Sequence, residues 1–169
     1  GDIITQQVLE ISHHENSEAL AHRLSWLGAE MIVSCLALDD LGERLRTPQR
    51  HEEATFARNL RKSDGLIRWT RGAQQTHDSI RAFNPWPGAY TFLGDLRVII
   101  HSSTVRVDVQ ALSPGQIALD NDRLLVGTAD ASLEILELTP AGKRLMDGQA
   151  FAKGYLSRLP VNEHKFSQE

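Results

Sequence analysis

The second half of this chain is a series of short apolar segments separated by turn residues, and this pattern limits the folds that the chain can adopt. The segments are residues 90–93, 96–101, 104–109, 116–119, 123–128 and 132–138. Each alternates in the manner of a β-strand, and five or six such strands lie within about 55 residues. Connections this short join antiparallel neighbours. The pattern therefore predicts an α+β, mainly β fold built on a small antiparallel barrel of five to six strands.

An amphipathic helix is predicted over residues 17–38, where apolar side chains recur at intervals of three and four residues. Its apolar stripe comprises Leu20, Leu24, Leu27, Met31, Cys35 and Leu38. Asn16 or Ser17 can cap the start of this helix, and Gly42 marks its end. Cys35 is the one cysteine, which excludes an internal disulfide, and its place in the stripe favours a small core residue over a nucleophile.

The other segments are assigned more simply. Residues 2–11 suit one or two short strands, and the polar residues 43–64 suit a linker across a surface. Thr70 can cap a short helix that ends near Phe83, and a closing helix is expected after Asp147. The inward positions of the short helix are Ala73, His77 and Ile80, which makes His77 a half-buried, hydrogen-bonded histidine rather than a ligand.

A rigid corner is expected between that short helix and the first strand of the barrel. Its residues are Arg81, Phe83, Asn84, Pro85, Trp86, Pro87 and Gly88. The two prolines fix the backbone, while Gly88 permits a conformation that other residues resist. Phe83 and Trp86 supply apolar area that can pin the corner to the barrel. A structural junction is at least as good an explanation of this segment as direct contact with a ligand.

The basic residues gather in one part of the chain. The formal net charge is -4, yet residues 58–97 carry seven basic side chains against three acidic ones. This concentration can present a local patch that attracts phosphates, although a solvated basic face without a partner is an equally simple explanation.

The sequence offers no self-evident catalytic or metal-binding set. His13 and His14 would point to opposite faces of a strand, so they cannot share one ion, and no metal is expected. Neither a Gly-rich phosphate loop after a strand nor a Gly-x-Ser-x-Gly elbow is present. With no apolar run of membrane-spanning length and no secretory signal at its start, the chain is expected in the cytoplasm, away from membranes.

Three stretches of the chain resemble the C-terminal half of the methionyl-tRNA formyltransferases. They are residues 65–70 (Gly-Leu-Ile-Arg-Trp-Thr), residues 81–90 around the corner, and residues 139–146 (Thr-Pro-Ala-Gly-Lys-Arg-Leu-Met). The resemblance runs from Gly1 to about Leu159. It implies an OB-like barrel that, together with the linker, holds initiator tRNA for formylation at translation initiation. The basic residues of the chain suit that task, because the acceptor arm of a tRNA exposes closely spaced phosphates along its length.

The same resemblance assigns catalysis to residues that this chain lacks. Family members carry a catalytic Asn, His and Asp in a Rossmann-like domain that binds 10-formyltetrahydrofolate. Gly1 and Asp2 match the end of the family's Leu-Asp-Thr-Gly-Asp motif, so Asp2 is not the catalytic acid and no catalytic residue is expected here. The implied divisions are residues 1–42, a remnant of the catalytic domain; 43–68, the interdomain linker; 69–160, the barrel with its short helices; and 161–169, a frayed polar tail.

Basic residues of the linker, the late loop and the closing helix are the expected contacts to tRNA. They are Arg58, Arg61, Lys62, Lys143, Arg144, Lys153 and Arg158. The expected partners are initiator tRNA and the catalytic domain, with self-association through the apolar stripe of the Leu20–Leu38 helix. Two alternatives stay open: a structural or interaction module without nucleic-acid binding, and a fragment of a sugar-nucleotide formyltransferase.

Overall fold

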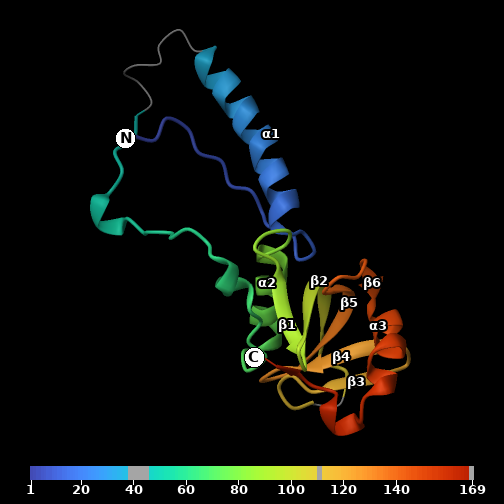
Figure 1. The fold of residues 1–169 in the computed structure, drawn as a ribbon. Coiled ribbons are helices and arrows are strands. Elements are labelled where there is room, and N and C mark those ends of the chain that lie inside the picture. The colour runs from blue at the N-terminus through green and yellow to red at the C-terminus, as the bar shows by residue number, and fades with distance from the viewer. Residues whose placement is uncertain (38–45, 110–111, 168–169) are drawn as a thin grey trace. The chain divides into compact units, whose positions relative to one another are not determined.

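The computed structural model describes residues 1–37, 46–109 and 112–167, and the chain divides into two compact units, Gly1–Asn59 and Leu60–Glu169. Figure 1 shows a long helix in the first unit and a sheet flanked by helices in the second. Among the described residues, the hydrophobic core cluster lies in the second unit. The assignment of residues 1–42 to a catalytic-domain remnant stays a prediction.

Helix α1, Ser17–Leu36, dominates the first unit, close to the predicted 17–38. The Asn16 side chain accepts a hydrogen bond from the Ala19 N–H at 2.9 Å, which confirms the predicted cap. The end marker Gly42 lies outside the described residues. No side chain of α1 is buried, so the prediction of a core position for Cys35, which is partly exposed, was wrong for the described chain. Self-association through this helix stays a prediction.

The strands predicted in residues 2–11 are not formed. Only Ile3 pairs there, in an isolated antiparallel bridge with Thr47, and the first unit also holds a short 3-10 helix, His51–Glu53. An alternating pattern needs a neighbouring strand to pair with, and no described segment of this unit supplies one beyond that bridge.

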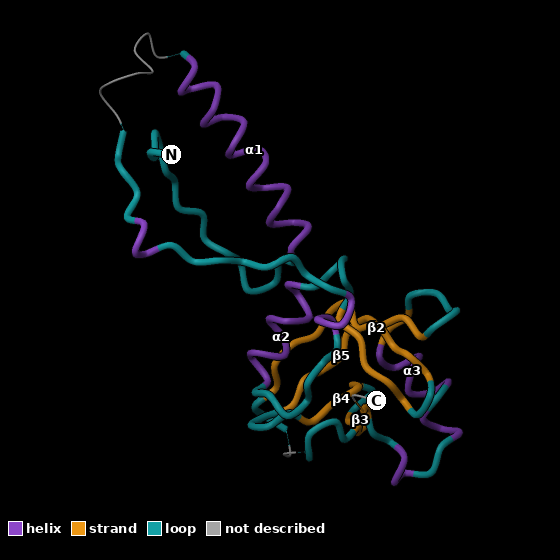
Figure 2. Tube along the Cα trace, turned by 60° about the vertical axis from the view of Figure 1, so that its left-hand side comes forward, coloured by secondary structure: helices purple, strands orange, loops and turns teal. Residues whose placement is uncertain are grey.

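The second unit is built on an antiparallel sheet of seven strands, drawn in orange in Figure 2. The strands are β1 (Ala89–Leu93), β2 (Leu96–Arg106), β3 (Ile117–Asp120), β4 (Arg123–Gly127), β5 (Ser132–Pro140), β6 (Met146–Asp147) and β7 (Phe166–Ser167). Their order is β3-β4-β5-β2-β1-β7, and β6 pairs with β5. These ladders confirm the predicted antiparallel, mainly β fold, and the strand order is an open path from β3 to β7.

Two details of the strand prediction were wrong. The segments 96–101 and 104–109 form the single strand β2, whose pairing with β5 shifts register between Ile100 and Ser103. The strand ends at Arg106, so Val107, which was predicted to lie in a strand, follows its end and is 84% exposed. A register shift bends a strand without ending it, so the two serines between the predicted segments, Ser102 and Ser103, interrupt the alternation but not the strand.

The C-terminal tail is also better ordered than predicted. Phe166, within the segment expected to fray, belongs to β7 and is only 1% exposed. Its ring stacks on Trp69, with the ring centres 5.8 Å apart. The Thr91 hydroxyl donates to the Ser167 carbonyl at 2.8 Å and accepts from Trp69 Nε1 at 3.0 Å. This buried network fastens the tail to β1.

Two α-helices flank the sheet, together with 3-10 turns at Lys62–Gly65, Leu156–Arg158 and Val161–Glu163. Helix α2, Ala73–Ala82, contacts β2 and β5 and buries Ala73, His77 and Ile80, as predicted. Its N-cap is Gly72 rather than the predicted Thr70. The first free N–H, that of Ala73, donates instead to Asp130 Oδ1 at 2.7 Å. Helix α3, Gly148–Gly154, is the expected closing helix, and Asp147 caps it through Ala150 N at 2.7 Å.

Removing the Thr91 hydroxyl should destabilise the sheet unit. We expect Thr91→Val to lower the free energy of unfolding by about 1–3 kcal/mol, because Trp69 Nε1 loses its buried acceptor and the Ser167 carbonyl its donor. Urea unfolding measures the change. Thr104→Val, at a partly exposed position of β2, is the matched control and should change stability by less than about 0.5 kcal/mol. Equal effects of the two substitutions would contradict this role for the network.

Candidate nucleic-acid interface

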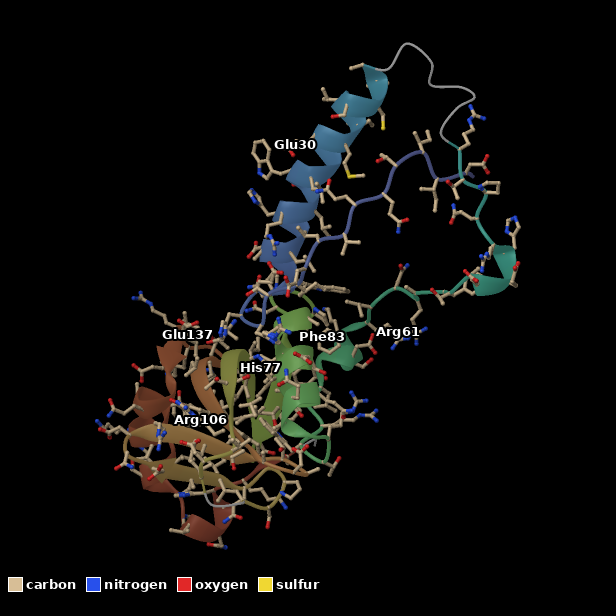
Figure 3. All side chains as sticks on the ribbon, turned by 180° about the vertical axis from the view of Figure 1, so that it is seen from behind. Glu30, Arg61, His77, Phe83, Arg106 and Glu137 are labelled. Atoms are coloured by element: carbon tan, nitrogen blue, oxygen red, sulfur yellow. The ribbon has the colours of Figure 1, made fainter. Side chains whose placement is uncertain are left out.

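The basic end of the linker lies against the start of the sheet. A 3-10 turn, Lys62–Gly65, brings Gly65 so close to the carbonyl of Gly88 that no side chain fits between them. Immediately afterwards Ile67 N donates to the Tyr90 carbonyl at 2.8 Å. Arg61 and Lys62 are exposed at the entrance to this turn, where Figure 3 labels Arg61. Backbone contacts therefore place two of the predicted tRNA contacts beside β1.

The late basic loop is held beside β2. Residues 141–145 connect β5 to β6, and Ala141 N donates to the Arg97 carbonyl at 2.8 Å. Lys143 N closes a turn onto the Pro140 carbonyl at 3.0 Å, and Gly142 adopts a positive φ of 73°. The side chains of Lys143 and Arg144 are exposed. Two further predicted contacts are thus fixed at the start of β2.

Aromatic and cationic side chains occupy the sheet surface between these two segments. In β1, Ala89, Thr91 and Leu93 are buried, so Tyr90 and Phe92 face outward. Phe92 pairs with the exposed Arg97 of β2. The Arg97 guanidinium carbon lies 4.1 Å from the centre of the Tyr90 ring, and the Tyr90 and Phe92 rings meet edge to face, 5.8 Å apart.

We call the whole arrangement the basic strip. It comprises Arg61, Lys62, Tyr90, Phe92, Arg97, Lys143 and Arg144. Arg97 lies in the positively charged segment 58–97, but the sequence pattern did not single out Arg97, Tyr90 or Phe92 as contacts to tRNA. The alternation of residues 90–93 contained the necessary information, because once the buried positions are known the outward ones follow.

The corner before β1 is held by hydrogen bonds within itself and to β2. Gly88 N donates to the Phe83 carbonyl at 2.8 Å, and Asn84 Nδ2 donates to the His101 carbonyl at 2.9 Å. Phe83 packs against the core, and Gly88 has a positive φ of 83°, as its residue type indicates. Trp86, by contrast, is 55% exposed. The prediction that its side chain packs against the barrel and holds the corner was therefore largely wrong.

The remaining corner residues frame this junction. Arg81 forms an ion pair with Asp78 at 2.7 Å, and the structure places Pro85 in an exposed and Pro87 in a partly buried position. Burial raises the pKa of Asp78, but hydrogen bonds from Arg81 and Gln74 outweigh it and leave that pKa below its ordinary value. Arg81 is therefore engaged within the molecule.

The other predicted tRNA contacts lie on other elements. Arg58 is exposed in the first unit. Lys153 and Arg158 are exposed on α3 and on the turn after it, and α3 packs on β4, β5 and β6. Contact between these three residues and tRNA stays a prediction.

His101 lies on the same outward face of β2 and is partly buried. Its Nε2 lies 3.0 Å from the Thr139 hydroxyl. Burial lowers the pKa of His101 from its ordinary value of 6.5, and the charge of Glu137 only partly opposes this shift. At neutral pH the imidazole therefore acts as a hydrogen-bonding group and adds no charge to the surface.

Within residues 1–37, 46–109 and 112–167, no group of three or more His, Cys, Asp or Glu side chains is placed to hold a metal ion. In the same ranges, no helix combines the length and the apolar character that crossing a bilayer requires.

Comparison with known proteins shows what the region around the strip is similar to. The family described as formyl transferase, C-terminal domain, matches residues 59–156. The methionyl-tRNA formyltransferase of Koribacter versatilis is 38% identical over 156 residues, covering 92% of this chain and 49% of that protein. The one of Thermodesulfovibrio yellowstonii is 36% identical over 164 residues, covering 96% and 51%. The chain thus spans about half the length of the curated relatives it matches.

The fold also recurs among solved structures. A variant of HypX from Aquifex aeolicus matches with a TM-score of 0.69 at 15% sequence identity, and the match covers 95% of this chain and 29% of that one. A second HypX variant matches with a TM-score of 0.67 at 16% identity, covering 93% and 29%. At such low identity the likeness shows a shared fold alone.

The close approach of Gly65 to Gly88 can be tested by adding a methyl group. A Cβ at Gly65 would overlap the Gly88 carbonyl oxygen, so we expect Gly65→Ala to lower the free energy of unfolding by about 1–3 kcal/mol. Gly154→Ala is the control, because nothing lies within 4 Å of the added carbon. Urea unfolding of both variants measures the difference, and a stable Gly65→Ala protein would show that the linker is not held at this point.

His101 should make stability depend on pH. Its pKa is 6.5 when unfolded and lower when folded, so the unfolded chain binds more protons as the pH falls below about 6.5. The stability of the wild-type chain should therefore drop between about pH 7.5 and pH 5.5 by more than that of His101→Gln. Thermal unfolding at the two pH values measures this, and parallel changes in Tm would contradict it.

Proposed function

Because the chain belongs to the formyl transferase C-terminal domain family, we propose that it is the tRNA-binding portion of a methionyl-tRNA formyltransferase. The curated relatives named above support this choice of substrate, since both carry that name. The basic strip is the observation that carries the proposal. It joins residues that lie about 80 positions apart in the sequence into one exposed cationic surface.

The dimensions of the strip suit a nucleic-acid backbone. It runs from the linker across β1 and β2 to the loop after β5, which is three strand spacings or about 15 Å. The exposed Lys and Arg side chains at both ends can each neutralise a phosphate. Such contacts give salt-sensitive affinity that does not depend on sequence, while the rest of the whole enzyme would position the methionyl end.

Formyl transfer itself belongs to the whole enzyme in this proposal. The resemblance assigns the catalytic Asn, His and Asp, together with 10-formyltetrahydrofolate, to a Rossmann-like domain that the matched family region does not include. We therefore propose that this chain binds initiator tRNA in the cytoplasm.

We also propose that the sheet curls into an OB-like barrel that presents the strip. The two ends of the strand order approach each other at Gln116, which bridges to Lys165. There Ile117 N donates to the His164 carbonyl and Phe166 N to the Gly115 carbonyl, each at 2.8 Å. These bonds bring the start of β3 next to the start of β7, which is the contact that a closed barrel requires.

Removing cations from the strip should weaken tRNA binding and its dependence on salt. For Lys143→Ala/Arg144→Ala we expect the slope of log affinity against log salt concentration to fall by about two, one for each lost phosphate contact. Titration of initiator tRNA into the full chain, followed by fluorescence anisotropy at several salt concentrations, measures the slope.

A matched control and a contrary outcome are available in the same assay. Arg71→Ala removes one exposed cation that lies away from the strip. The Arg71 carbonyl accepts a hydrogen bond from Ala129 N, just before the start of β5, whereas Lys143 and Arg144 follow the end of β5. This substitution should change the slope by less than about 0.5. If the wild-type chain binds no tRNA, the chain is a structural or interaction module instead. If an amino-sugar nucleotide is the acceptor for the full-length protein, the sugar-nucleotide alternative holds.

A further inference from the structure

The middle of the basic strip is built differently from its ends. The ends carry exposed cations, whereas in the middle the Arg97 guanidinium lies over the Tyr90 ring, and Phe92 contacts Tyr90 edge to face and pairs with Arg97. A phosphate is bound by positive charge and hydrogen-bond donors, and aromatic rings add nothing to that contact. Resting on the proposed tRNA binding, we propose that Tyr90, Phe92 and Arg97 form a platform on which one unpaired base of the RNA stacks.

The platform is fixed in position before any ligand arrives. Tyr90 is held on one side by its pairing with Ile99 and on the other by the bond from Ile67 N to its carbonyl. The Arg97 carbonyl accepts from Ala141 N, and its guanidinium is attracted to the negative face of the Tyr90 ring, 4.1 Å away. Because the Arg97 guanidinium is restrained in this way, it loses little conformational entropy when a base stacks on it.

The exposed surfaces match the chemistry of a base. Tyr90 and Phe92 are partly exposed, and Arg97 is exposed, so the open side of the guanidinium plane remains accessible. Bases stack on aromatic rings and on guanidinium planes, and each base has such a face whatever its sequence. A base within a duplex is already stacked on both sides, so the platform selects an unpaired nucleotide.

The charges on either side favour RNA over a protein as the occupant. Arg61 and Lys62 lie beyond β1, and Lys143 and Arg144 lie beyond β2. A nucleotide on the platform would therefore have cations available for the phosphates on both its 5′ and its 3′ side. The surface thus presents a cation, an aromatic ring and a cation in turn. This order matches single-stranded RNA, in which each base lies between two phosphates.

The test separates a stacked base from a phosphate contact. The probes are an eight-nucleotide single-stranded RNA and an abasic RNA of the same length and charge, each titrated into the full chain. We expect Arg97→Lys, which keeps the charge but loses the planar group, to weaken binding of the normal RNA about tenfold. The same variant should bind the abasic RNA within about twofold of wild type.

Two further variants complete the design. Tyr90→Leu removes the ring and should lose about as much affinity for the normal RNA as Arg97→Lys. If Tyr90→Leu fails to fold, Arg97→Lys alone decides. Lys143→Ala/Arg144→Ala should weaken both probes equally, because it removes phosphate contacts only.

The outcomes distinguish this inference from the function on which it rests. If the wild-type chain binds both probes equally, or if Arg97→Lys affects both to the same extent or neither, the platform is overturned while tRNA binding stands. If neither these probes nor initiator tRNA binds to the wild-type chain, the proposed function fails as well.

Discussion

The pairing of β2 with β1 on one side and β5 on the other is the interaction on which the rest of the structure depends. It gives β2 two faces with opposite roles. Val98 and Ile100 point inward and are fully buried, whereas Arg97 and His101 point outward. Because side chains alternate along a strand, a slip of one residue would expose the core and bury the cationic surface together. The same register therefore produces both the stability of the unit and the composition of the basic strip.

Local patterns in the sequence predicted most of the elements. The three-and-four spacing located α1, and Ala73, His77 and Ile80 identified the buried side of α2. What the sequence could not reveal depends on residues far apart in the chain. The acceptor at the start of α2 is Asp130, 57 positions after Ala73. The strand at Phe166 is only two residues long and forms because β1 and the Trp69 ring are available to it. Such contacts leave no periodic pattern to detect.

The candidate site was predictable in the same uneven way. Charge density and the resemblance selected Arg61, Lys62, Lys143 and Arg144, and backbone contacts bring the two pairs to the same part of the sheet. The resemblance also selected Arg58, Lys153 and Arg158, which lie on other elements. Tyr90, Phe92 and Arg97 were missed, because an aromatic residue in a strand is as easily a core residue until the register is known. A chain of net charge -4 can thus present a cationic surface, because the fold gathers basic residues locally.

We propose that the outward face of β1 and β2, with the segments on either side, contacts tRNA. The most direct test follows backbone amide resonances of the full chain by nuclear magnetic resonance while initiator tRNA is added. The account predicts that the largest shifts fall on residues 61–67, 90–97 and 141–144 and are reversed by high salt. Shifts confined to β3 and β4, or no shifts at any tRNA concentration, would contradict it.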